Sequence, residues 1–152
     1  MKLEKVEYKK DWSAPAKRHP HTVAREFVLQ CLYMKELNKE GELNELYANY
    51  LNRNFYAKKL YEAVLQNQTT IDAMIKKLAA NWEIKRIAAV ERNILRLAIV
   101  ELQVFPKHSF KIVINEAVDL AKKYSNNEAG GFINGVLDQL KPSPRTIQQI
   151  IP

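Results

Sequence analysis

Residues 84–104 have the sequence IKRIAAVERNILRLAIVELQV, the most apolar stretch of the chain. Its apolar side chains recur every three or four residues, as expected for an α-helix that faces a core. Because the apolar face is broad, we expect a central helix that is covered on most sides. Pro106 is expected to end this helix. The residues of the apolar face are Ile87, Val90, Ile94, Leu97 and Ala98, with Leu95 and Leu102 beside them.

Helical patterns also lie on both sides of this segment, and no segment shows the period-two alternation of a strand bounded by turn residues. The predicted helices cover about residues 22–38, 44–66 (one or two helices), 70–80, 84–104, 110–124 and 131–140. Expected breaks lie at Gly41, residues 52–54 and Gly130-Gly131, and expected helix caps are Thr22, Thr69 or Thr70, and Ser109. The sequence therefore predicts an all-α fold, a compact bundle of about seven helices.

The two ends of the chain differ from this helical region. Residues 1–20 show no sustained periodicity, and Pro15 and Pro20 interrupt any helix there, so we expect a flexible basic arm. Residues 142–152 begin with closely spaced prolines, and we expect a loose tail. Residues 21–141 then form a single helical domain. The chain of 152 residues is 47% hydrophobic, which is enough for one domain with a core.

The formal net charge of +7 is unevenly distributed along the chain. Residues 1–25 carry four more basic than acidic side chains, and residues 76–111 carry five more. Residues 26–75 carry two more acidic side chains, and residues 112–152 are balanced. If the fold brings the two basic segments together, they form one surface that attracts phosphates. The alternative is two separate solvated faces.

We find no motif for catalysis or for a cofactor. The chain has no glycine-rich phosphate loop, nucleophile elbow, His-Glu-x-x-His helix or paired-cysteine zinc spacing. Cys31, the single cysteine, is expected to be a buried structural thiol, and His19 and His21 are better explained as exposed or phosphate-facing imidazoles than as metal ligands. No apolar run reaches the roughly 18 residues of a membrane span. These features predict a soluble cytoplasmic protein that is not an enzyme and needs no cofactor or metal.

Four motifs follow one another along the helical region. They are AREFVLQCLY at residues 24–33, ERNILRLA at 91–98, INEAVDLAK at 114–122 and FINGVLD at 132–138. Each motif alone is typical of an ordinary amphipathic helix. Together, in this order and at these separations, they resemble the NusB family of transcription antitermination proteins. The resemblance covers about residues 22–141, with a weaker match in the middle.

The resemblance implies an all-helical fold of two packed three-helix subdomains. It also implies binding to single-stranded boxA-like RNA in the leader of ribosomal RNA transcripts, together with NusE, a ribosomal protein of the small subunit. Such a complex helps RNA polymerase to pass terminators, so the antitermination complex of RNA polymerase is a further implied partner. The sequence leaves open whether the chain also forms a homodimer.

The resemblance places the candidate site residues in two groups. For RNA binding it implies the start of the first predicted helix and the Phe-x-Asn-Gly segment; the residues are Lys17, Arg18, His21, Arg25 and Phe132. For NusE binding it implies Tyr33 and Glu91. Cationic groups suit phosphates, and an aromatic ring can stack on an unpaired base. The alternatives are an ion pair for Arg25, a place in the core for Phe132 and a solvated charge for Glu91.

Two departures from the family pattern remove positive charge from the implied RNA surface. His21, Thr22 and Val23 replace the arginines that usually precede Ala-Arg-Glu, and Gly131 replaces the cation that usually precedes Phe-x-Asn-Gly. The lysines of the arm are expected to compensate. Two hypotheses follow: an RNA-binding adaptor that acts with NusE, and a protein-interaction module that acts mainly through NusE or as a homodimer, with reduced RNA binding.

Overall fold

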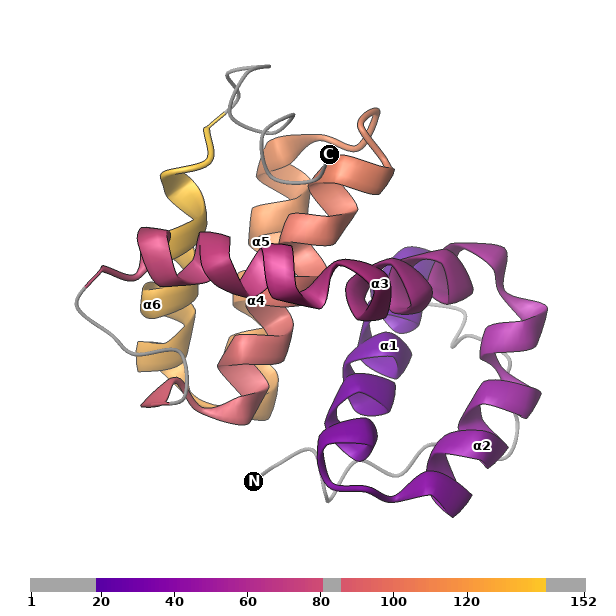
Figure 1. Ribbon diagram of the computed structural model, residues 1–152. Helices are drawn as coiled ribbons and strands as arrows, with labels where there is room; N and C mark the ends of the chain where they lie inside the picture. The colour runs from indigo at the N-terminus through magenta and orange to yellow at the C-terminus, as the bar shows by residue number, and fades with distance from the viewer. Residues whose placement is uncertain (1–18, 81–85, 142–152) are drawn as a thin grey trace.

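The computed structural model describes residues 19–80 and 86–141, and within these ranges it contains six α-helices, one 3-10 turn and no strand (Figure 1). The elements are α1 (Pro20–Glu36), α2 (Glu40–Asn49), η2 (Leu51–Arg53), α3 (Phe55–Leu78), α4 (Ala89–Val104), α5 (Phe110–Tyr124) and α6 (Asn127–Asp138). Residues 1–18 of the predicted arm and the predicted tail lie outside the described residues. The all-α prediction is confirmed, with one α-helix fewer than expected.

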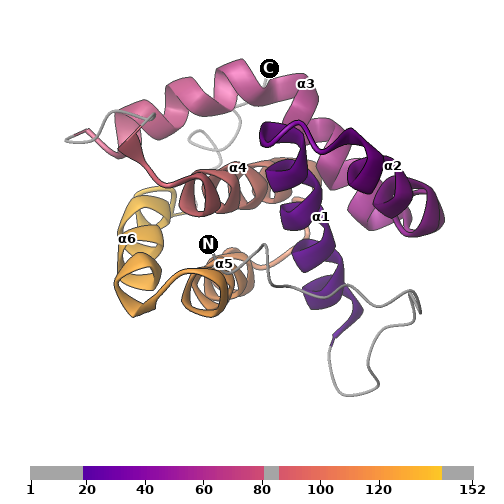
Figure 2. The ribbon, with the colours of Figure 1, turned by 90° about the horizontal axis from the view of Figure 1, so that it is seen from below.

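The helices form two groups that meet at α4. The first group is α1 to α3, the second is α4 to α6, and both α1 and α3 also contact α4. Arg25 near the start of α1 pairs with Glu101 near the end of α4, and Glu36 pairs with Arg92 at the opposite ends of both helices. Helices α1 and α4 therefore run antiparallel. Figures 1 and 2 show α3 crossing α4 on the side away from α5.

Helix α4 is the most buried element of the described fold. Of its 16 residues, only those near its ends and a few polar ones are solvent-accessible, and Ile94, Leu95 and Ile99 are fully buried. The prediction of a central helix is confirmed, although the helix begins at Ala89 and not at residue 84. Cys31 on α1 is also fully buried in this core, and burial raises the pKa of its thiol, as expected for a structural cysteine.

Local polar groups start several helices as the sequence predicts. Ser109 Oγ accepts a hydrogen bond from the backbone N–H of Ile112 at the start of α5. The polar run at residues 52–54 divides α2 from α3, and Asn54 Oδ1 accepts a hydrogen bond from the N–H of Ala57. Such bonds satisfy N–H groups that have no partner within the first turn of a helix.

Two boundaries around α1 are predicted wrongly. The cap of α1 is His19, whose Nδ1 accepts a hydrogen bond from the N–H of His21, and Pro20 begins the helix. Thr22 therefore lies in the first turn, and its hydroxyl donates to Glu116 on α5 instead (2.7 Å). Gly41 lies inside α2, because the chain already turns at Asn38, which has a left-handed φ of 57°.

Helix α3 continues through the predicted cap at Thr69 or Thr70. Both threonines are exposed on the outer face of the helix. Ile71 and Ile75 are fully buried and extend the apolar stripe of the preceding turns, so the helix gains further burial by continuing. The predicted pair of helices in this region is therefore one helix.

Gly130 and Gly131 do not break the chain but lie within α6. The helix starts earlier because Asn126 Oδ1 accepts a hydrogen bond from the N–H of Ala129 (2.8 Å). The helix thus begins three residues before the first glycine. Because glycine is helix-compatible at a cost of about 1 kcal/mol, a good cap and buried neighbours are sufficient to override it.

Candidate functional site

A buried ion pair lies at the start of α1. Arg25 donates through Nε to Glu101 Oε1 (2.7 Å) and through Nη2 to Glu101 Oε2 (2.6 Å). The two side chains are only 5% and 1% exposed. Arg25 Nη1 also lies 3.5 Å from Glu116 Oε1. The guanidinium that we predicted as an RNA contact is therefore occupied in this structure, and the alternative, an ion pair, is the interaction observed.

The protonation of this pair follows from its geometry. Burial alone would raise the pKa of Glu101, but hydrogen bonds and attraction from Arg25, together with a hydrogen bond from His108, hold that pKa below its ordinary value. Burial likewise opposes the charge on Arg25, but Glu101 outweighs it and raises the pKa of the guanidinium. Both groups stay charged, and each neutralises the other.

His21 lies in a cluster of aromatic rings above this ion pair. Its ring stacks on Tyr56 at the start of α3, with 3.9 Å between the ring centroids, and lies 5.3 Å from the ring of His108. His108 Nδ1 is 3.0 Å from Glu101 Oε2. Burial and the charge of Arg25 lower the pKa of His21, so its imidazole is uncharged at neutral pH. His21 thus offers a ring and not a cation. Lys17 and Arg18 lie outside the described residues.

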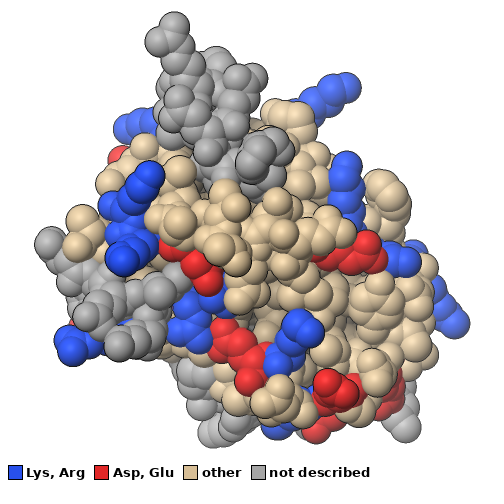
Figure 3. Space-filling model, in the orientation of Figure 1, with Lys and Arg blue, Asp and Glu red and all other residues tan. Residues whose placement is uncertain are grey.

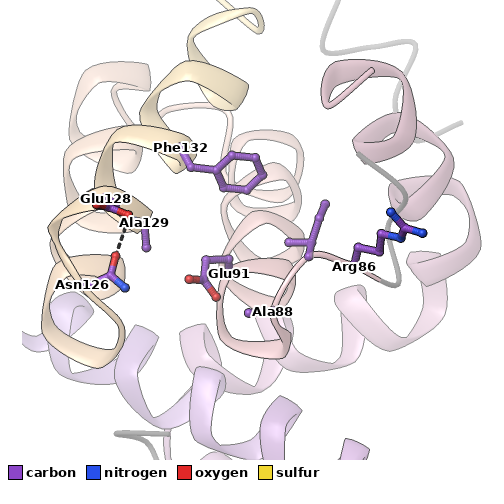
Figure 4. Close-up of a pocket in the computed structure, with 8 residues that line it drawn as sticks. Arg86, Ala88, Glu91, Asn126, Glu128, Ala129 and Phe132 are labelled. Carbon is purple, nitrogen blue, oxygen red and sulfur yellow. Dashed lines mark hydrogen bonds between the residues drawn. The ribbon is translucent and has the colours of Figure 1, made fainter. Parts of the chain in front are cut away.

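Phe132 lines a hollow between α6 and the segment that leads into α4 (Figure 4). The hollow has a volume of about 340 Å³. Its lining residues are Arg86, Ile87, Ala88, Glu91, Asn126, Glu128, Ala129 and Phe132. The ring of Phe132 is partly buried and packs against the core, while Figure 4 shows it pointing from α6 toward the start of α4. Phe132 therefore packs partly in the core, as the alternative predicted, while part of it stays at the surface; its stacking on an RNA base remains a prediction.

Glu91 lies in the same hollow and is not a simple solvated charge. Ser125 Oγ donates to its Oε1 (2.7 Å), which ties the start of α4 to the end of α5. Its other oxygen, Oε2, is buried and has no hydrogen-bond partner among the described residues. A buried carboxylate oxygen without a hydrogen-bond donor is unfavourable for the fold.

Tyr33 lies on α1, near the end of α4 that carries Glu91. It is 6% exposed and belongs to the core. One turn later Glu36 pairs with Arg92 (2.8 Å) and with Arg96 (3.0 Å), and Asp72 also binds Arg96. Both arginines of α4 thus bind acidic neighbours within the fold. The structure brings both predicted NusE-binding residues to one end of the molecule, with Tyr33 largely covered.

The NusB family model matches residues 22–142 of the chain. The chain belongs to the NusB family. Transcription antitermination protein NusB from Dictyoglomus thermophilum is 42% identical over 117 residues, covering 76% of this chain and 80% of that protein. The protein of the same name from Thermodesulfovibrio yellowstonii is 36% identical over 133 residues, covering 77% and 88%.

Solved structures of NusB-family proteins are similar to this fold. T. maritima NusB has a TM-score of 0.73 at 25% identity, covering 86% of this chain and 99% of that chain. A crystal structure of the antitermination factors NusB and NusE in complex with double-stranded RNA has a TM-score of 0.67 at 34% identity, covering 78% and 93%. These comparisons confirm the family and the fold. They concern whole chains, so the assignments of single site residues remain predictions.

Within this NusB-family fold, the predicted site residues divide between the two ends of α4. His21 and Arg25 lie at the end that carries Glu101, whereas Phe132 lies at the end that carries Glu91. The two glutamates are ten positions apart in α4, which corresponds to about 15 Å at a rise of roughly 1.5 Å per residue. Sequence reasoning missed Arg86, Asn126 and Glu128, which complete the hollow. Only the packing of α6 on α4 brings them together, and no local pattern signals it.

On the face in Figure 3, the described basic side chains do not form one continuous patch. The end of the first basic segment does meet the second, since Arg25 and His21 contact Glu101 and His108. However, Arg92 and Arg96 are neutralised by Glu36 and Asp72. On the face in Figure 3, acidic side chains gather toward α2, and basic side chains project at separate places. Within residues 19–80 and 86–141 there is also no cluster suited to a metal ion and no helix able to cross a membrane.

Proposed function

We propose that the chain is an RNA-binding transcription antitermination adaptor that binds boxA-like leader RNA together with NusE in ribosomal RNA transcription. Family membership and the likeness to the solved complex of NusB and NusE with RNA support this function. The chain acts in the cytoplasm by binding and not by catalysis, as a component of the antitermination complex of RNA polymerase.

The hollow beside Phe132 carries the proposal. It presents a partly exposed aromatic ring next to the exposed Arg86 and to the polar groups of Asn126 and Glu91. An unpaired base can stack on the ring, while its edge hydrogen-bonds with nearby polar groups. Double-stranded RNA offers no such free base faces, so single-stranded RNA is the form that this hollow suits best.

Two glycines on α6 support a contact from outside the chain. Gly131 and Gly135 are exposed, lie one turn apart and flank Phe132 in the sequence. A Cβ atom at either position would meet nothing within 4 Å, so packing inside the protein does not require glycine there. Glycine nevertheless destabilises a helix by roughly 0.5–1 kcal/mol relative to alanine. A bare helix surface allows the backbone of a bound RNA or protein to approach closely.

The start of α1 contributes to RNA binding in a different way from the arginine run that family members carry there. Arg25 holds α1 on α4 through Glu101, and we assign it a positioning role for the RNA-binding side chains around it. Lys17, Arg18 and His21 remain the predicted contacts at this end. The variant Arg25→Ala is therefore a poor test of RNA contact, because it would leave Glu101 buried without its partner.

The test is RNA binding by the full chain, measured as the fluorescence anisotropy of a labelled boxA-like single-stranded RNA across a salt series, with and without NusE. We expect binding that weakens as salt rises and strengthens with NusE. The variant Phe132→Leu should lower the affinity about 5- to 100-fold, because it removes the stacking ring and keeps an apolar side chain. Phe27→Leu is the matched control, since Phe27 is also partly buried but its ring stacks on Tyr50 and does not line the hollow. Equal affinities of Phe132→Leu and the wild type would contradict this site.

A second function is favoured because Arg25 is paired with Glu101 and the imidazole of His21 is uncharged. Both reduce the positive charge available to RNA at the start of α1. In this alternative the chain is a protein-interaction module that acts mainly through NusE or as a homodimer. NusE binding without any RNA binding at low salt would support it. Sedimentation of the free chain separates the NusE-dependent form from the homodimer.

A further inference from the structure

Phe55 is the most exposed of the large hydrophobic residues in the described ranges. It is the first residue of α3, and 77% of its surface is exposed, against 55% for Ile112 and 40% for Leu37. The helix does not need this ring to begin, because Asn54 caps it through the N–H of Ala57. An exposed ring of this size contributes little to the core. The ring is therefore accessible to a partner molecule.

Lys59 holds a cation next to this ring. Its Nζ lies 5.9 Å from the ring centroid of Phe55 and 5.0 Å from that of Phe105, which follows the end of α4. Lys59 is exposed, and no acidic side chain in the described ranges forms a salt bridge with it. By contrast, its neighbour Lys58 lies 3.9 Å from Glu62. Lys59 thus carries an unneutralised charge above two aromatic rings.

The aromatic surface continues from Phe105 toward the start of α1. Phe105 stacks on His108, with centroids 5.1 Å apart and ring planes 12° apart, and it also contacts Tyr56. Tyr56 in turn stacks on His21. The first turns of α1, α3 and α5, whose starts meet at these rings, contain no acidic residue. We name the four residues Phe55, Lys59, Phe105 and His108 the aromatic platform.

We propose that the aromatic platform is a second contact for single-stranded RNA, at the opposite end of α4 from Phe132. Unpaired bases stack on Phe55 and on the Phe105–His108 pair, and the Lys59 ammonium binds a backbone phosphate. Alternating rings and cations are the usual surface for single-stranded nucleic acid. An acidic peptide would use the charge of Lys59 but would leave the exposed ring of Phe55 without a function. The proposal rests on the proposed RNA-binding function.

RNA length separates the two contacts. About 15 Å of α4 separates Glu91 at the hollow from Glu101 beside the platform. An oligonucleotide too short to span this distance occupies the hollow alone, whereas the same oligonucleotide extended at both ends also reaches His21 and the platform. The platform therefore predicts that variants there weaken binding of the extended RNA and leave binding of the short RNA nearly unchanged.

The experiment measures binding of both RNAs to the full chain of 152 residues and to four variants of it. Phe55→Leu should weaken binding of the extended RNA roughly 5- to 100-fold, while Phe55→Trp, which keeps a ring, should retain it. Lys59→Gln should weaken binding and reduce the slope of log affinity against log salt by about 0.7, the share of one phosphate. Lys77→Gln, an exposed lysine at the far end of α3, is the matched control.

The outcomes separate this proposal from the proposed function. If the wild type binds the extended RNA and Phe132→Leu weakens it, but Phe55→Leu and Lys59→Gln do not, the platform is overturned and the RNA-binding function stands. If Lys59→Gln weakens binding of the extended RNA but Phe55→Leu and Phe55→Trp bind it with equal affinity, the site is a charge contact of the kind that an acidic peptide would use. Base stacking is then overturned. If the wild type binds neither RNA, with or without NusE, both proposals fail.

Discussion

Glu101 joins three elements through a single buried side chain. It accepts two hydrogen bonds from Arg25 on α1 and lies 3.0 Å from His108 in the loop before α5. The side chain is 1% exposed, so its charge is stable only while Arg25 remains in place. The same residue therefore sets the position of α1 and of the loop that carries Phe105 and His108 of the aromatic platform.

This dependence predicts a loss of stability in acid. Because the pKa of Glu101 is held below its ordinary value of 4.5, the folded state binds this proton less readily than the unfolded state. The resulting stabilisation is present above pH 4.5 and is lost as the pH falls through the lowered pKa. We expect the free energy of unfolding, measured by urea denaturation at a series of pH values, to drop steeply below pH 4.5.

The variant Glu101→Gln isolates this effect. At neutral pH it should lower the free energy of unfolding by about 3–5 kcal/mol, since it leaves the charge of Arg25 buried without its counterion. It should also flatten the acid dependence below pH 4.5. Asp138→Asn is the control, because Asp138 and its partner Lys141 are both exposed and their pair contributes less than about 1 kcal/mol. An unchanged acid dependence in Glu101→Gln would assign the acid loss to other groups.

At the scale of elements, α6 differs from an ordinary surface helix. Its buried face carries Ile133, Val136 and Leu137, while its open face carries Gly131 and Gly135. Gly130 is different, because a Cβ there would lie 2.9 Å from Cγ of Lys122 on α5. One glycine thus allows α6 to pack closely on α5, and the two others leave a bare surface beside Phe132.

Alanine substitutions distinguish these glycines. Gly131→Ala and Gly135→Ala should each raise the free energy of unfolding by roughly 0.5–1 kcal/mol, because alanine favours the helix and its methyl group meets no neighbour. Gly130→Ala should raise the free energy of unfolding by a smaller amount, or lower it, since the Lys122 side chain must move. Thermal and urea denaturation measure the change. If RNA or NusE approaches the open face closely, the two stabilised variants should bind more weakly than the wild type.

At the scale of the whole molecule, α4 makes the two helix groups one folding unit. It contacts α1 and α3 on one side and α5 and α6 on the other. Ile94 is fully buried near the middle of this helix. Helices from both groups pack on α4. Because both groups depend on this helix, unfolding is expected to be cooperative.

The variant Ile94→Ala should lower the free energy of unfolding by about 2–5 kcal/mol, through lost burial and the cavity that remains. We expect a single transition in urea, with coincident curves from circular dichroism and intrinsic fluorescence, for both the wild type and the variant. Ile112→Ala is the control, because that isoleucine is 55% exposed. Two separate transitions would show that the helix groups unfold independently.

The helices, the central position of α4 and the family could be predicted from the sequence alone, because they depend on periodicity and on motifs that lie within short segments. Helix ends were less predictable, since Thr69, Thr70, Gly130 and Gly131 signal breaks locally but lie in helices held by distant packing. The ion pair of Arg25 with Glu101, in contrast, could not be predicted from the sequence. The two residues are 76 positions apart, and no local pattern records which helix faces will meet.

The same limit applies to the surfaces that we propose for RNA. Phe132 was predictable as a candidate, but the hollow beside it forms only where α6 packs against the start of α4. Phe55, Lys59, Phe105 and His108 come from α3 and from the α4–α5 loop, and nothing in the spacing of these segments places them together. A helix pattern is encoded over a few residues, whereas exposure and charge pairing are properties of the assembled fold.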